Sequence, residues 1–125
     1  MPIPDGAIEL AAPMDSREVL EYLFPMSPVL EFDEAIDPAD WNLALLPEAV
    51  ALGMEIRSGD PLRSDPKLVE ENKTVFAWFS IDPAFRGNVA FQGGGAPMPM
   101  EVTLTTTAVE PRERQRTFVI RVKEQ

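Results

Sequence analysis

The sequence predicts an all-β domain, built as a β-sandwich or a β-barrel. Apolar and β-branched side chains recur with period 2 over residues 100–108 and again over residues 117–122, as in strands that cover a core with one face. Residues 73–81 alternate too, but carry large apolar groups on both faces, as a central strand does. Proline and glycine separate such segments about every 8 to 12 residues, which is the spacing of a sandwich or barrel.

The composition supports one globular domain with a core of its own. The chain has 125 residues, of which 45% are hydrophobic and 26% are charged. Its 13 prolines cannot sit inside helices or central strands without the loss of hydrogen bonds. We therefore expect short antiparallel strands, many fixed loops, and at most one or two short helical turns.

Residues 1–14 are predicted to form an extended N-terminal arm, and residues 15–125 a single β-sandwich domain. The arm contains three prolines and a possible short strand around residues 7–11. A loose chain end is the commoner behaviour of such a segment. The functional alternative is an arm that becomes ordered against another subunit.

The segment after the arm fits either a helix or a strand. Asp15 or Ser16 could cap a helix. However, residues 19–24 are apolar almost all round, and Pro25 and Pro28 would end any helix early. We favour a strand that enters the sandwich.

An acidic stretch follows, and it is best explained as a solvated loop. Calcium loops place oxygen ligands at alternate positions before an obligatory glycine, and the acids of residues 29–40 do not match that spacing. Residues 37–41 predict a turn, in which Pro38 fixes one dihedral and Trp41 anchors the loop on the core.

The middle of the chain predicts one helical turn and another strand. We expect the turn just before Pro47, followed by a strand over residues 49–57, where apolar side chains alternate with small or charged ones. Residues 58–66 are rich in turn-forming residues and predict a loop.

Beyond the central strand, the chain is expected to return through short strands and turns. Residues 89–92 predict a short strand, and Gly93 to Gly95 a wide turn or bulge. The proline-rich residues 96–99 are predicted to belong to that turn. Residues 112–116 predict a tight, charged hairpin turn before the last strand.

The residue types argue against catalysis and against a bound cofactor or metal. The chain has no cysteine and no histidine, so it lacks the usual zinc ligands and the usual base for a nucleophilic serine. No serine lies in a G-x-S-x-G context. The glycine run is followed by Pro97 and Pro99, which supply no amide donors for a phosphate. We expect a non-enzymatic protein.

The charge excludes several partners. A net charge of −10 disfavours binding to nucleic acid or anionic lipid. Residues 1–60 hold thirteen acids against two arginines, whereas residues 61–125 hold eight acids against nine bases. This asymmetry serves solubility, or it orients the protein against a charged neighbour. We expect neither secretion nor membrane insertion, because there is no basic leader and no apolar run of about 18 residues.

Part of the chain resembles a known family. The stretches VAFQGGG, MEVTLTTT and RQRTFVIRV resemble the C-terminal strands of small structural proteins of tailed bacteriophages. Residues 18–22 and 49–57 are similar to earlier segments of that family. The resemblance implies an immunoglobulin-like antiparallel β-sandwich and a non-enzymatic place in the virion. The proline-rich residues 96–99 and a long insertion over residues 25–40 depart from the family pattern, so head, neck and tail positions all stay open.

We therefore expect a capsid decoration (cement) protein or a head–tail neck component, made in the bacterial cytoplasm and incorporated in the virion. Its partners would be major capsid or neck and tail proteins, with many copies on a lattice or a homo-oligomer. The candidate contacts are Ile3, Ile8 and Leu10 in the arm, with Arg112 and Arg114 at the hairpin tip.

Two other function classes remain as alternatives. The acidic first half could imitate DNA and inhibit a host nucleic-acid enzyme, although the acids form no regular ladder at phosphate-like spacing. A small hydrolase would need a metal or two converging acids. Neither feature is visible in the sequence.

Overall fold

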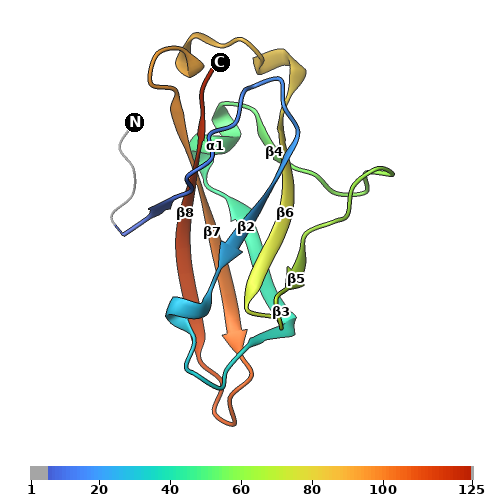
Figure 1. Ribbon diagram of the computed structural model, residues 1–125, viewed down its shortest axis with the longest axis vertical. Coiled ribbons are helices and arrows are strands. Elements are labelled where there is room, and N and C mark those ends of the chain that lie inside the picture. Colours follow the sequence, from blue (N-terminus) through green and yellow to red (C-terminus); the bar gives the residue numbers. More distant parts are fainter. Residues whose placement is uncertain (1–5, 125) are drawn as a thin grey trace.

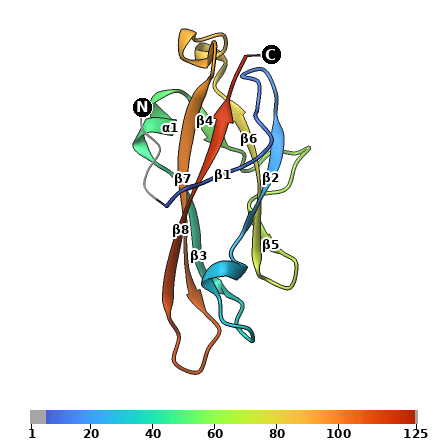
Figure 2. The ribbon, with the colours of Figure 1, turned by 60° about the vertical axis from the view of Figure 1, so that its left-hand side comes forward.

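The computed structural model describes residues 6–124 as two packed β-sheets (Figure 1). One sheet has the order β1 (Ile8–Glu9), β8 (Glu113–Val122), β7 (Ala96–Thr106), β3 (Ile36–Leu45). The other has the order β2 (Leu20–Pro25), β6 (Thr74–Ile81), β4 (Met54–Ile56), and β5 (Lys67–Val69) also pairs with β6. Figure 2 shows the two layers from the side. The predicted all-β sandwich is confirmed.

Aromatic side chains join the two sheets. The ring of Phe24 in β2 meets Phe79 of β6 at 5.7 Å and Phe118 of β8 at 5.1 Å, both edge to face. All three are fully buried, and Tyr22 extends the cluster with a ring 6.0 Å from Phe79. Edge-to-face pairs at such separations add to the burial of the apolar area. The centre of the sandwich is therefore aromatic.

The C-terminal hairpin has the predicted alternation. In β7, Val102, Leu104 and Thr106 are buried while the residues between them are partly exposed. In β8, Phe118, Ile120 and Val122 face the core. Val119, on the other face of β8, is also fully buried, and it is paired with Glu9 of β1. Period-2 patterning over a one-sided core predicts such strands well.

The predicted turn over residues 96–99 is wrong, because these residues begin β7. Pro97 and Pro99 pair with β8 on one side only. On the other side, β3 starts to pair only at Met100, and the chain beyond β3 approaches as a loop whose Leu46 N–H donates to Pro99 O at 3.0 Å. Proline tolerates the edge of a sheet, where its missing N–H breaks no ladder. The part of β7 before Met100 is such an edge.

β2 and β6 confirm the strands predicted from residues 19–24 and 73–81. The inner side chains of β6 are fully buried: Val75, Ala77, Phe79 and Ile81. The outer Phe76 and Trp78 are half-buried, and Lys67 and Arg63 lie over their rings at 5.2 and 5.5 Å. Cations above aromatic faces shield an otherwise exposed apolar surface.

Two predicted elements in the middle of the chain are replaced by others. Residues 37–41 are not a turn, because β3 runs through them with a register shift between Ile36 and Trp41. The strand expected from residue 49 begins only at Met54, after the helix α1 (Pro47–Ala51). Pro47 occupies the first helical turn, where its fixed φ suits a helix and its missing N–H costs nothing.

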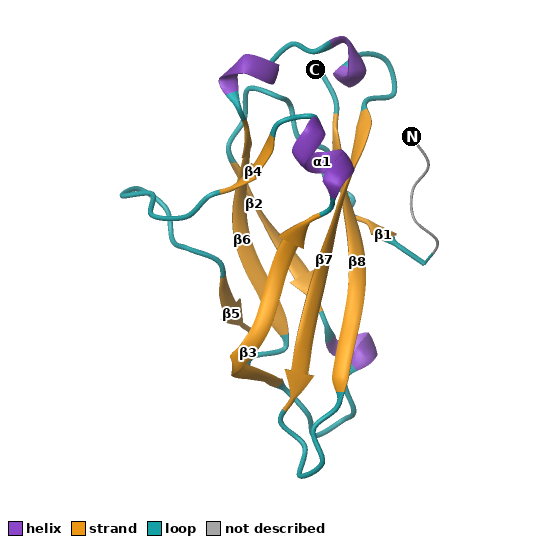
Figure 3. Cartoon of the chain, turned by 180° about the vertical axis from the view of Figure 1, so that it is seen from behind, coloured by secondary structure: helices purple, strands orange, loops and turns teal. Residues whose placement is uncertain are grey.

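Residues 89–92 are not a strand either. They form the 3₁₀-helix η3 (Val89–Phe91), because the Asn88 side chain accepts the Ala90 N–H at 2.8 Å and caps the turn. With η1 (Ser27–Val29), η2 (Pro83–Phe85) and α1, the described residues contain four short helical segments, more than the one or two predicted. Figure 3 shows α1, η2 and η3 at one end of the sandwich. Glycines 93–95 do form a turn.

The N-terminal segment lies along its own domain where the structure describes it. Ile8 and Glu9 pair in parallel with Phe118 and Val119 of β8. Further along, Met14 is fully buried, and its backbone exchanges hydrogen bonds with the chain at Arg121 and Lys123, at 2.9 and 2.8 Å. Residues 8–14 therefore form an edge of the first sheet. Ile3 lies outside the described residues.

Candidate interaction surface

Two loops meet at the end of the sandwich opposite α1, η2 and η3 (Figure 3). One, residues 30–35, leads into β3, and the other, residues 107–112, joins β7 to β8. The Ala35 N–H donates to Thr107 Oγ1, and the Thr107 N–H donates to Ala35 O, both at 3.0 Å. We call these two loops the apex. Their backbones hold one another in place.

A partly buried ion pair reinforces the apex. The guanidinium of Arg112 donates to Glu34 and forms a second ion pair with Glu31 at 3.3 Å. The Glu34 side chain is only 4% exposed, and it also accepts the Glu31 N–H at 2.8 Å. The Arg112 hydrogen bond, more than any other contact, lowers the pKa of Glu34 to about 2. Glu34 therefore stays ionised at neutral pH.

Two large apolar side chains project from the tips of these loops. Phe32 is 98% exposed and Val109 is 101% exposed, as much as in an extended chain. Single exposed apolar residues are common on proteins. Two that are almost fully exposed, on loops joined by hydrogen bonds and an ion pair, offer apolar area that a partner can bury.

A strained turn supports the apex from the second sheet. Glu70, Glu71 and Asn72, between β5 and β6, have φ angles of 53°, 60° and 61°. The left-handed region costs a non-glycine residue about 1 kcal/mol or more, and such strain gathers at functional sites. The Asn72 carbonyl accepts the Ile36 N–H at 2.8 Å. The strained turn is thereby fixed to the start of β3, next to the apex.

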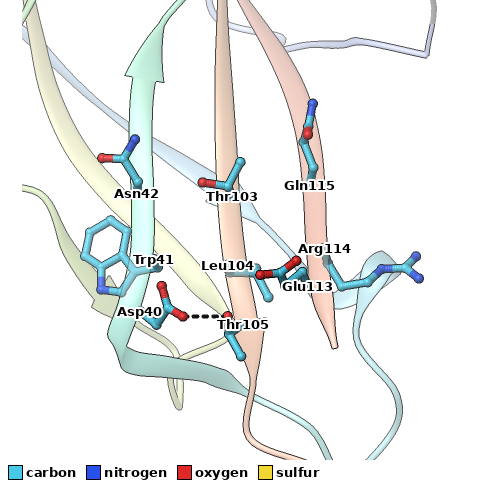
Figure 4. A pocket seen from close by; sticks show the side chains of 9 residues that line it. All are labelled: Asp40, Trp41, Asn42, Thr103, Leu104, Thr105, Glu113, Arg114 and Gln115. Carbon is cyan, nitrogen blue, oxygen red and sulfur yellow. Dashed lines mark hydrogen bonds between the residues drawn. The ribbon is translucent and has the colours of Figure 1, made fainter. Parts of the chain in front are cut away.

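Two concavities lie elsewhere on the molecule. A shallow polar groove of about 390 Å³ crosses β3, β7 and β8, where the Thr105 hydroxyl donates to Asp40 at 2.7 Å (Figure 4). A second, of about 340 Å³, lies between Ala12 and the β2 residues 20–23. Within residues 6–124, no three or more acidic residues converge to hold a metal, and no helix is long and apolar enough to span a membrane.

The structure separates the predicted contact residues. Ile8, 39% exposed, and the half-buried Leu10 lie with β1 midway along the sandwich, far from the apex (Figure 2). Arg112 belongs to the apex, but its charge is engaged within the chain. Arg114 is not in the hairpin tip; it is an exposed residue of β8 opposite Leu104.

Sequence reasoning missed Phe32 and Val109. A signal was present for Phe32, because it is a large apolar residue directly between acids, in a segment predicted to be a solvated loop. Val109 lies just before Glu110 and just after the alternating pattern of residues 100–108 ends, so it has no place on a strand face. An apolar residue with no place in a periodic pattern is a candidate for contact with a partner.

Comparisons with known proteins give no family for the chain: no family model, curated protein or solved structure matches it.

Proposed function

We propose that this protein is a non-enzymatic structural component that binds a neighbouring protein subunit through the apex. The observation that carries the proposal is the full exposure of Phe32 and Val109 on loops that the rest of the chain holds in place. Burial of a large apolar side chain is worth about 1.5 to 3 kcal/mol, so the pair offers about 3 to 6 kcal/mol to a complementary pocket.

The fixed loops favour association further. A loop that must become ordered on binding loses part of the gained free energy as conformational entropy. At the apex, the Ala35 and Thr107 backbones and the Arg112 ion pairs already restrict the loops. Binding therefore retains more of the apolar contribution than it would with mobile loops.

The virion of a tailed bacteriophage is the proposed setting, as a capsid decoration protein or a head–tail neck component. Two arguments support it. The C-terminal strands resemble those of such proteins, and the third, seventh and eighth strands share one sheet while the second and sixth share the other, as in an immunoglobulin-like sandwich. Many copies on a lattice would strengthen a modest contact by multivalency.

The experiment is an add-back to particles assembled without this chain. Purified full-length protein is mixed with particles of the source virus and sedimented. We expect the wild type to co-sediment and Phe32→Ser/Val109→Ser to remain in the supernatant. The control is Leu62→Ser/Val89→Ser, which removes two exposed apolar side chains outside the apex.

The outcomes separate the function classes. Failure of the wild type to bind particles would overturn the virion setting. Equal binding of both double variants would overturn the role of the apex. Capture of a purified basic nuclease with inhibition of its activity would instead support the DNA-mimic alternative.

A further inference from the structure

We infer that the partner of the apex presents an apolar socket rimmed by arginine or lysine side chains. This inference rests on the proposed function, since it names the chemistry of the surface that the apex binds. Two observations lead to it: acidic residues surround Phe32 and Val109, and the guanidinium of Arg112 is already paired with Glu31 and Glu34.

The surroundings of Phe32 and Val109 are acidic. Residues 30–35, 70–73 and 107–112 together hold six acids against Lys73 and Arg112. Five of these acids are exposed: Glu31, Asp33, Glu70, Glu71 and Glu110. Asp33 and Glu110 are direct neighbours of the two apolar residues in the chain. A partner that covers the apolar pair must therefore also meet several carboxylates.

The one arginine of the apex does not offset this charge toward a partner. Its guanidinium binds Glu34, which is buried, and Glu31, whose side chain is 68% exposed. The hydrogen bond to Glu34 raises the pKa of Arg112, so the pair remains ionised. The charge of Arg112 is used to build the apex, whereas Asp33 and Glu110 are exposed.

This arrangement selects among possible occupants. Two copies joined apex to apex would bring like charges together, which is unfavourable. An anionic membrane or a nucleic acid would be repelled in the same way. A basic protein surface gains both from steering at long range and from charge-assisted hydrogen bonds at contact. Arginine suits such a rim best, since its planar fork matches a carboxylate.

The test neutralises carboxylates of the apex and of the adjoining turn, residues 70–73, that have no hydrogen-bond or ion-pair partner among the described residues. The variant is Asp33→Asn/Glu71→Gln/Glu110→Gln, and the control Glu21→Gln/Glu48→Gln/Glu55→Gln makes the same change of charge on exposed acids elsewhere. In the particle add-back, we expect the association rate of the apex variant to fall about 10-fold or more and to depend less on salt, with a smaller change in the control. Equal effects of the two variants would overturn the inference.

A second measurement does not depend on particles. The isotope-labelled full chain is titrated with a peptide of alternating lysine and leucine and followed by NMR. We expect shifts concentrated in residues 31–33 and 107–111, and their loss in Phe32→Ser/Val109→Ser. Shifts spread evenly over acidic surfaces would overturn the inference. Localised shifts without particle binding would refute only the virion setting and leave the basic, apolar partner in place.

Discussion

Phe24 and Phe32 lie eight residues apart and are predicted to respond in opposite ways to truncation. Phe24 is fully buried between the rings of Phe79 and Phe118, whereas Phe32 is 98% exposed. Phe24→Ala removes a ring from the centre of the sandwich and leaves a cavity, which costs about 4 kcal/mol. Phe32→Ala removes no contact of the folded chain, so its cost is below about 0.5 kcal/mol.

Thermal unfolding followed by circular dichroism measures the difference. Unfolding entropy of about 2.1 cal/mol/K per residue gives about 0.26 kcal/mol/K for 125 residues, so Phe24→Ala lowers Tm by about 15 °C. Phe32→Ala lowers it by no more than about 2 °C. A loss below about 4 °C for Phe24→Ala would show that the two sheets do not close on this ring. A large loss for Phe32→Ala would show that its side chain packs against the domain and is unavailable to a partner.

Three further predictions test other contacts. The Tyr22 hydroxyl donates to the Ala12 carbonyl at 2.9 Å, and burial raises the pKa of Tyr22 to about 12. Tyr22→Phe should therefore lower the free energy of unfolding in urea by about 1 kcal/mol. In the wild type, ultraviolet absorbance should show no ionisation of the phenol below about pH 11. A Cβ at Gly53, where φ is 86°, would lie 2.5 Å from the ring of Phe85, so Gly53→Ala should cost about 2 kcal/mol or more, measured the same way. The hydrogen bond from Arg112 lowers the pKa of Glu34 from 4.5 to about 2, so the stability that this bond contributes is present above pH 4.5 and is lost as the pH falls toward 2. Glu34→Gln should remove this part of the dependence of stability on pH. An unchanged pH dependence in the variant would contradict the role of the bond.

The parts of the fold that follow from the sequence are those in which one face of a strand is buried. β6, β8 and the second half of β7 have a period of 2 because alternate residues enter the core. Pro97 and Pro99 were misread because proline alone indicates a break. Whether a proline is tolerated depends on where the neighbouring strand ends, and β3 ends at Leu45. That information lies far away in the chain.

The apex was beyond prediction for the same reason. Arg112 and Glu34 are 78 positions apart, and they meet only because Ile36 pairs with Thr106 across β3 and β7. Local patterns placed both residues correctly outside regular strands, yet no local pattern specifies which loops share an end of a sandwich. Sequence reasoning found an acidic loop and a charged turn as separate features. The structure joins them in one surface.

Ion pairs within the domain neutralise part of the charge asymmetry between the two halves of the sequence. Basic residues of the second half pair with acids of the first: Arg121 with Glu9 at 2.8 Å, and Arg112 with Glu31 and Glu34. The partly exposed pairs, Arg121 with Glu9 and Arg112 with Glu31, add little stability individually, whereas the Glu34 carboxylate of the third pair is buried. The charge asymmetry between the two halves of the sequence therefore overstates the separation of charge in the folded domain. The unpaired acids are the ones that stay available to the cations of a partner. At the apex those acids surround two fully exposed apolar side chains, so attraction and burial act at the same place.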